Sequence, residues 1–427
     1  MDTLSSFIVY FSSNFLSEPS FLVGLVVLVG LLLQKKSFDQ VVSGTVKSIV
    51  GFLLILTGAQ SMGMTLLPLQ PMLQHLFGME AEIVSIDKAM GAGMAAYGAS
   101  ATLIFTLGFL INVLLARFTR FKYIHLSAHV SFFYAGLIAA LLTVGTNLST
   151  INIVWIGSLM LGIYLTLTPA MVAPLMKYVP GGEGFTIGHS SSVGCFISGH
   201  LGKVVGNKKR NLEDIKLPAK LNFLRETTIA LSVIMVLFFL VVTLAAGKGF
   251  VEQNVSGGKD FIAFAILQGI QFGVWITVII TGVRMMLAEI IPAFHGISEK
   301  LVPNSTPGLD VPLLFPNHPT SVIVGFLSSL TAGLIGMVIL GWIKYPVIVF
   351  PALIPTFFTG AVTAIFGNAT GGRRGAVIGS FINGLILIFG QALLLPYVGE
   401  YEAVMRVLSE TDYTFYGPII GAILSWF

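Results

Sequence analysis

The chain has little charge and almost no cysteine. Only 10% of its 427 residues are charged, whereas an ordinary soluble domain carries about 25%. A water-soluble surface cannot be built from this composition. The single cysteine, Cys195, excludes an internal disulfide and a cysteine metal cluster, and its apolar surroundings of small residues predict inert packing. No Walker loop, zinc-spaced His/Cys set or GxSxG elbow occurs, so we expect neither cofactor nor metal, and ATP-driven pumping by this polypeptide alone is disfavoured.

Apolar residues make up 55% of the chain, and the mean hydropathy is +0.91. Several apolar runs approach or exceed the roughly 20 residues that cross a hydrocarbon core. The sequence therefore predicts an all-α polytopic membrane protein with about eleven transmembrane helices, plus re-entrant hairpins. The clearest runs are Phe21–Leu33, Ser48–Leu67, Ile151–Met176, Thr228–Ala246 and Ser321–Trp342.

Basic residues alternate between loops in the way that sets membrane orientation. Most of the 23 Lys and Arg residues gather in alternate loops, above all Lys203–Arg225, whereas acidic residues dominate Gly399–Tyr413. We expect a multi-pass protein of the bacterial inner membrane with its N-terminus outside. Met1–Ser20 lacks the basic region of a cleavable signal peptide. The net charge of +4 is assigned to orientation, and no nucleic-acid partner is expected.

The two halves of the chain resemble each other. The segment AHVSFFYAGL around His129 is similar to NHPTSVIVGF around His318, and GGEGFTIGHS from Gly181 is similar to GGRRGAVIGS from Gly371. An odd number of spans between the copies would invert one against the other, as in many transporters. We therefore predict a first membrane repeat at 1–202, a basic cytosolic linker at 203–225, a second repeat at 226–396, and an outer loop with a last short helix at 397–427. The linker could dock a partner or only anchor orientation.

Four segments contain too many small residues or prolines for simple spans: Asp87–Ala101, Pro180–Gly202, Asn304–Thr320 and Gly367–Arg374. Irregular backbone at membrane depth is tolerated only where it is buried in protein or lines a wet cavity. These segments therefore predict re-entrant hairpins around a substrate path. A face of small residues for close helix packing is the alternative, above all for Asp87–Ala101.

Ionisable and strongly polar side chains within such segments are candidate site residues. His129 and His189 could each bond a hydroxylated solute or be satisfied core histidines. Asp310, which lies between prolines, could accept from paired hydroxyls and act as proton acceptor, or could cap a turn. Ser190 and Ser191 follow His189, and Asn317 precedes His318; these three are further candidates for substrate binding.

Other polar and aromatic side chains favour structural roles. Arg284 and Glu289 fall near the inner end of a span, where an ion pair or interfacial anchoring is the ordinary explanation. Phe133 lies four residues after His129 and either packs in the core or stacks on a sugar face.

Taken together, five motifs resemble the membrane (IIC) component of the ascorbate-type phosphotransferase system (PTS) permeases, related also to the galactitol group. The similarity extends over nearly the whole chain. It is carried by SGTVKSIVGF (Ser43–Phe52), SAHVSFFYAGLIA (Ser127–Ala139), GFTIGHSSS (Gly184–Ser192), GVRMMLAEIIPAFHGISEKLVP (Gly282–Pro303) and IPTFFTGAVTAIFGNATGG (Ile354–Gly372).

The resemblance implies a homodimer whose protomers each have a dimerisation domain and a mobile core domain that carries the solute by an elevator-type movement. It also implies that a separate cytosolic IIB protein, supplied by IIA, phosphorylates the solute, because this chain has no phosphoryl-carrying residue. The substrate-contacting histidines and aspartate of the family are matched by His129, His189 and Asp310. Glutamines of the ascorbate members are replaced by Phe133 and Ser190–Ser192, so fewer fixed hydrogen-bond partners are expected.

The solute class stays open at this point as a sugar acid, a lactone or a polyol. An ion-coupled secondary transporter on the same scaffold is the main alternative function, with His129, His189 and Asp310 as proton sites. A membrane scaffold or receptor that moves nothing is a third.

Overall fold

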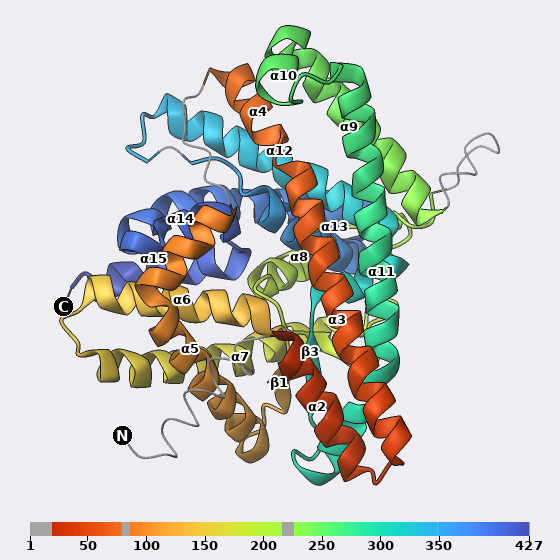
Figure 1. Cartoon of the computed structure of the whole chain (residues 1–427), viewed down its shortest axis with the longest axis vertical. Coiled ribbons are helices and arrows are strands. Elements are labelled where there is room, and N and C mark those ends of the chain that lie inside the picture. Colours follow the sequence, from red (N-terminus) through yellow and green to blue (C-terminus); the bar gives the residue numbers. More distant parts are fainter. Residues whose placement is uncertain (1–18, 79–85, 216–225, 348, 427) are drawn as a thin grey trace.

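Helices form most of the chain. The computed structural model describes residues 19–78, 86–215, 226–347 and 349–426 (Figure 1). Among these residues, eight helices are long and apolar enough to cross a membrane. They are arranged as two groups that pack chiefly among themselves. In Figure 1 the helices α3 (Phe38–Leu66) and α11 (Phe261–Lys300) run along the long axis, whereas α6 (Ala128–Gly145) and α7 (Thr150–Met176) cross it.

The first group is built around α3 and α11. With 40 residues, α11 is about 60 Å long at 1.5 Å per residue. Glycines allow α3 to approach α11 closely, because the side of Gly51 lies directly against the backbone of Met286. Its other members are α2 (Pro19–Leu33), α4 (Leu69–Phe77), α9 (Thr227–Ala246) and α10 (Lys248–Asn254).

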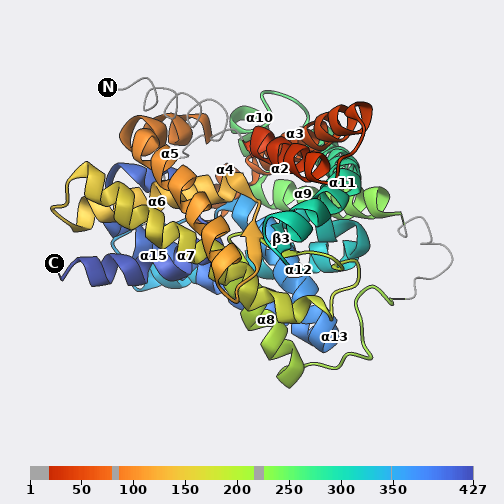
Figure 2. The ribbon, with the colours of Figure 1, turned by 90° about the horizontal axis from the view of Figure 1, so that it is seen from below.

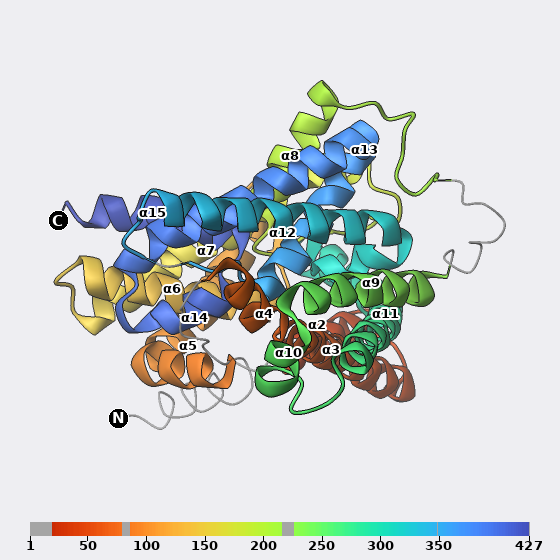
Figure 3. The ribbon, with the colours of Figure 1, turned by 90° about the horizontal axis from the view of Figure 1, so that it is seen from above.

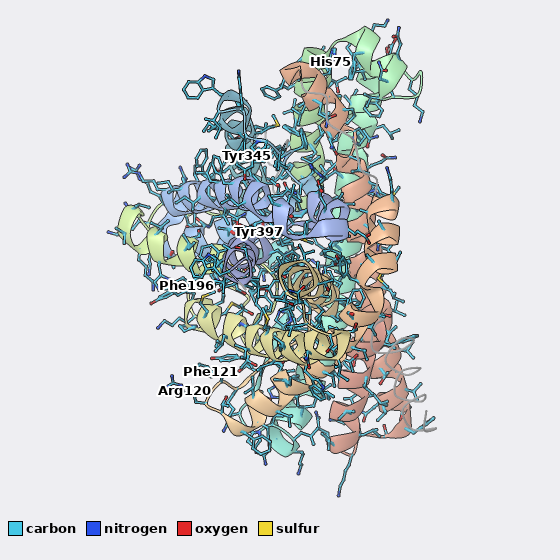
Figure 4. The ribbon with its side chains drawn as sticks, turned by 90° about the vertical axis from the view of Figure 1, so that its left-hand side faces the viewer. His75, Arg120, Phe121, Phe196, Tyr345 and Tyr397 are labelled. Carbon is cyan, nitrogen blue, oxygen red and sulfur yellow. The ribbon has the colours of Figure 1, made fainter. Side chains whose placement is uncertain are left out.

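Two side-chain contacts help to define this group. Glu289 pairs with Lys47 of α3 at 3.5 Å, while Arg284 is exposed, so the ion pair involving Glu289 joins two helices and does not include Arg284. His75 stacks on Phe250 with ring centroids 3.8 Å apart. Figure 4 shows His75 near one end of the long axis and Arg120 towards the other.

The second group contains the remaining long helices and most of the interrupted backbone. Its members are α5 (Ile86–Phe118), α6, α7, α8 (Ser192–Val205), α12 (Pro319–Trp342), α13 (Leu353–Leu394), η4 (Leu395–Tyr397), η5 (Gly399–Tyr401), α14 (Glu402–Leu408) and α15 (Thr411–Leu424). Figures 2 and 3 show that the C-terminal end of α8 and the middle of α13 project together from this group.

The helix α13 folds back on itself at Gly372. This residue has φ 61° and ψ −154°, a conformation that only glycine adopts readily. The arms on either side of it run antiparallel, since Gly367 packs against Gly375 and Asn383 donates a hydrogen bond to Thr359 across 2.9 Å. The interruption predicted at Gly367–Arg374 is therefore confirmed, whereas its re-entrant position in a membrane stays a prediction.

Three short strands form a parallel sheet that the sequence did not predict. They are β1 (Tyr123–His125), β2 (Thr186–Ile187) and β3 (Thr306–Leu309), in the order β1-β3-β2. Tyr123 is paired with Thr306, and Ile187 with Leu309. The hydrogen bonds of the sheet pair the backbone N–H and C=O groups of these extended segments, which water could not pair in the interior of a membrane protein. The predicted interruptions within 180–202 and 304–320 coincide with β2 and β3 and are confirmed.

One predicted interruption is wrong. Asp87–Ala101 belongs to the continuous helix α5. Its small residues instead permit close contact, because Gly93 lies against Tyr401 and Val404, which is the packing alternative.

The long apolar helices among the described residues are fewer than the eleven expected spans. Eleven is reached only by adding α2, α15 and the second arm of α13 to the eight long apolar helices, so eleven stays a prediction. Inverted repeats also stay a prediction. The expected outer location of the N-terminus concerns residues 1–18, and part of the linker concerns 216–225; both lie outside the described residues.

Candidate functional site

The candidate site lies where the three strands end. Each strand leads within a few residues into a helix: β1 into α6, β2 into α8, and β3 into the 3-10 helix η3 (Val311–Asn317). Because the strands are parallel, their carboxyl ends meet at one edge of the sheet. This topology brings together His129 from the first turn of α6, His189 from the turn before α8, and Asp310 directly before η3.

Asp310 stands between the two histidines. Its Oδ2 lies 3.6 Å from Nε2 of His129, and its Oδ1 lies 3.6 Å from Nε2 of His189. The Val311 N–H donates to Oδ1 across 2.7 Å and fixes the carboxylate. Asp310 and His189 are buried, whereas 27% of the His129 side chain is exposed. A ligand would therefore reach this cluster past His129.

Several buried polar atoms at the cluster have no hydrogen-bond partner. They include Nδ1 of His129, Nδ1 of His189 and Oγ of Ser127. Buried polar groups in proteins are nearly always paired, so unpaired ones at a polar cluster indicate atoms that a ligand completes. Neighbouring Ser192 differs, because its hydroxyl donates to the His189 carbonyl across 3.0 Å.

A fourth ionisable side chain, Glu410, joins the cluster from the turn before α15. Its Oε2 lies 3.3 Å from Nδ1 of His189 without hydrogen-bond geometry. The four groups form an alternating chain, Glu410–His189–Asp310–His129. Each imidazole therefore has a carboxylate beside it, an arrangement that can hold or pass a proton.

Asp412, two residues further on, holds the first turn of α8. Its carboxylate accepts from the N–H of Ser192 at 3.2 Å, the N–H of Val193 at 2.9 Å and the hydroxyl of Tyr164 at 2.9 Å. Its own N–H donates to the Ser190 carbonyl across 2.9 Å. A negative charge at a helix N-terminus is favourable, and here it fixes the turn that carries His189.

Sequence reasoning missed Glu410 and Asp412, which it assigned to an acidic outer loop. Both are buried. The signal that could have found them is an acidic residue directly before and just inside the start of the apolar segment Thr411–Leu424, which is a helix N-terminal pattern.

Not every predicted residue lies in the cluster. Asn317 is exposed at the far end of η3, beside Gly181. Phe133 lines a small separate cavity with Tyr401 and Val404. Ser191 is buried, and its hydroxyl accepts from the thiol of Cys195 at 4.0 Å.

The cluster also has the composition of a cation site. One atom each from His129, His189 and Asp310 lies within 4.8 Å of the others. Two imidazoles and a carboxylate suit a divalent transition metal as well as a set of hydroxyls. The expected absence of metal therefore stays a prediction.

A polytopic membrane protein with a buried polar cluster at interrupted helices has the architecture of a membrane transporter. Residues 14–412 match the EIIC-GAT family, described as PTS system sugar-specific permease component. The chain belongs to this family. It is also 27% identical, over 380 residues, to the "Ascorbate-specific PTS system EIIC component" of Mycoplasma pneumoniae (strain ATCC 29342 / M129 / Subtype 1). That similarity covers 78% of this chain and 57% of the relative, so the chain spans little more than half of the relative's length.

Proposed function

We propose that this chain is a PTS IIC permease that translocates a sugar acid, a lactone or a polyol for phosphorylation by a separate IIB protein. The observation that carries the proposal is the contact of Asp310 with both His129 and His189, each 3.6 Å away, at the meeting point of three helix starts. Family membership supports the sugar class. The relative named for ascorbate, at 27% identity, supports an ascorbate-like solute without fixing it.

The cluster can bind a hydroxylated solute without a long side chain. Asp310 accepts from hydroxyl groups, while His129 offers a buried ring nitrogen that has no protein partner. Ser190 and Phe133 stand where the resemblance places glutamines, and the structure directs Phe133 to another cavity. A pocket with so few fixed amide groups suits a flexible polyol or sugar acid.

The proposed reaction needs a base in this chain and a phosphoryl donor from outside it. A solute hydroxyl oxygen attacks the phosphorus of the IIB phosphocysteine, the sulfur–phosphorus bond breaks, and the cysteine leaves as thiolate. The hydroxyl proton passes to Asp310, which His189 and His129 flank. The role of this chain is therefore to hold the hydroxyl and to accept its proton.

Movement of the solute is proposed to be an elevator-type shift within a homodimer. The two helix groups are consistent with this because they pack chiefly among themselves and cross at a large angle (Figure 1). His129, His189 and Glu410 belong to the group that contains α6, α8, α13 and α15, whereas Asp310 lies between β3 and η3, which also contact α11. The group built on α3 and α11 would supply the fixed dimerisation domain.

Transport with purified components tests the proposal. Proteoliposomes should accumulate phosphorylated solute only when phosphorylated IIB is supplied. His189→Ala should abolish this accumulation. Uptake of unmodified solute that ignores the phosphoryl donor and collapses with a protonophore would instead establish the ion-coupled alternative. The chain of ionisable groups that ends at buried Glu410 is the observation that favours this second candidate.

A further inference from the structure

Three lysines converge on one aromatic ring outside the site. The Nζ atoms of Lys177, Lys203 and Lys208 lie 5.2, 5.2 and 4.5 Å from the ring centre of Tyr178. None of the three forms an ion pair with a carboxylate of the described residues. Attraction to the face of the ring holds each ammonium group there, and three positive charges gathered around one ring favour an anion beside them.

A cavity of about 340 Å³ is lined by one of these lysines, Lys177. Its volume is at the lower end of the range for small-molecule sites, about 300–1,000 Å³. Lys177 belongs to both the cavity and the lysine cluster. The other lining residues are Met176, Gly182, Glu183, Gly184, Phe185 and Thr306.

Two strands run from the cavity to the site. β2 leads from Phe185 at the cavity to His189 at the site, and β3 leads from Thr306 at the cavity to Asp310. Four residues of extended chain span about 13 Å at 3.3 Å per residue. The cavity therefore lies at the opposite edge of the same sheet from the polar cluster.

The loop that carries Lys208 is fastened to the tip of the α13 hairpin. The N–H of Asn207 donates to the Gly371 carbonyl across 2.7 Å, and the N–H of Arg373 donates to the Arg210 carbonyl across 2.8 Å. Asn368 joins in by accepting from the Leu212 N–H at 2.9 Å. A loop held in place loses less entropy on binding, so Lys208 is prepared for a ligand.

We infer that the lysine cluster around Tyr178 and its adjoining cavity form an anion site that takes a phosphate monoester. The inference rests on the proposed function and deepens it. Lysine ammonium groups bind phosphate as point charges with charge-assisted hydrogen bonds. The monoester is either the phosphorylated solute after it leaves the polar cluster, or the phosphoryl group that the donor protein presents. Glu183 is the one carboxylate among the lining residues and opposes the anion.

Calorimetric titration of the purified protein with sorbitol 6-phosphate, inorganic phosphate and sorbitol tests the inference directly. The two phosphates should bind with an affinity that Lys208→Ala lowers, whereas any binding of sorbitol, at the polar cluster, should be the same in that variant. Lys208→Ala should weaken phosphate binding about tenfold, since hydrogen bonds to charged groups are worth about one decade or more. Glu183→Gln should strengthen it, because a repelling charge is removed.

Lys209→Ala is the matched control, because Lys209 is exposed in the same loop and does not lie over the ring. Equal phosphate affinity in Lys208→Ala and Lys209→Ala overturns the inference, as does absence of phosphate binding to the wild type. The inference is also overturned if Lys208→Ala binds sorbitol 6-phosphate as tightly as the wild type and loses only its binding to vesicles that contain anionic lipid. That result would assign the lysines to membrane anchoring.

Inside-out vesicles distinguish the two sources of the phosphate. If the solute is the source, added sorbitol 6-phosphate inhibits solute phosphorylation in the wild type and not in Lys208→Ala. If the donor is the source, Lys208→Ala raises the KM for phosphorylated IIB. Wild-type vesicles that form no phosphorylated solute contradict the proposed function, whereas the titrations with purified protein still decide the anion site by themselves.

Discussion

Replacing Asp412 by asparagine tests how the first turn of α8 supports the site. The carboxylate accepts two backbone N–H groups and the Tyr164 hydroxyl, all of them buried. An asparagine keeps one acceptor oxygen and presents an NH₂ group in place of the other. At least one of the N–H groups of Ser192 and Val193 then faces another donor.

The cost can be worked out from these contacts. An unpaired buried N–H costs about 1–3 kcal/mol, and loss of the negative charge at a helix N-terminus costs about 0.3–1 kcal/mol more. A neutral amide is easier to bury than a carboxylate, which offsets part of this. We expect a net loss of about 2 kcal/mol, most of it felt by the turn that carries His189–Ser191. If that turn is required for binding, solute affinity falls about 30-fold.

The assay is a thermal-shift titration of purified protein. A screen of pentitols, hexitols, ascorbate and aldonic acids first identifies the solute that raises the unfolding temperature of the wild type. Asp412→Asn should then unfold at a lower temperature and need a higher solute concentration for the same shift. Asp260→Asn is the control, because Asp260 accepts from Ile262 and Ala263 at the start of α11, far from the cluster. It should lose a little stability and no affinity. Unchanged affinity in Asp412→Asn would refute the reasoning.

Three further predictions follow from the same contacts. Asp310→Asn should abolish solute binding in the thermal-shift assay without changing the oligomeric state in size-exclusion chromatography. Asn317→Ala, at an exposed position, should bind solute normally. Equal loss of binding in both variants would contradict the placement of the site. Glu410→Gln should weaken binding about tenfold, because the carboxylate 3.3 Å from Nδ1 of His189 is lost. Wild-type affinity in that variant would exclude a role for this charge. Gly372→Ala should destabilise the protein by about 1–3 kcal/mol, because the φ of 61° and ψ of −154° at this position suit only glycine. Gly249→Ala is the control and should not destabilise it, because Gly249 lies on a helix with open space beside it. Equal unfolding temperatures for the two variants would contradict the strain at the hairpin tip.

The sequence by itself determined the class of protein and most of the polar cluster. Apolar runs and sparse charge predict membrane helices because lipid cannot solvate charged groups, and eight such helices are present among the described residues. Polar residues within interrupted segments are costly in a membrane protein, which is why His129, His189 and Asp310 could be selected one by one. The interruptions at β2, at β3 and at the tip of α13 were readable from glycine and proline for the same reason.

Only the tertiary structure decided which of these residues meet. A parallel sheet joins segments that are far apart in the chain, and its order, β1-β3-β2, places Asp310 between the two histidines. Glu410 and Asp412 looked like loop residues because acidic side chains near a chain end are usually solvated, yet α15 packs them against α8. Asn317 was a candidate for substrate binding, yet η3 places it at its exposed end. Local composition records how costly a side chain is to bury, whereas long-range packing determines what it is buried against.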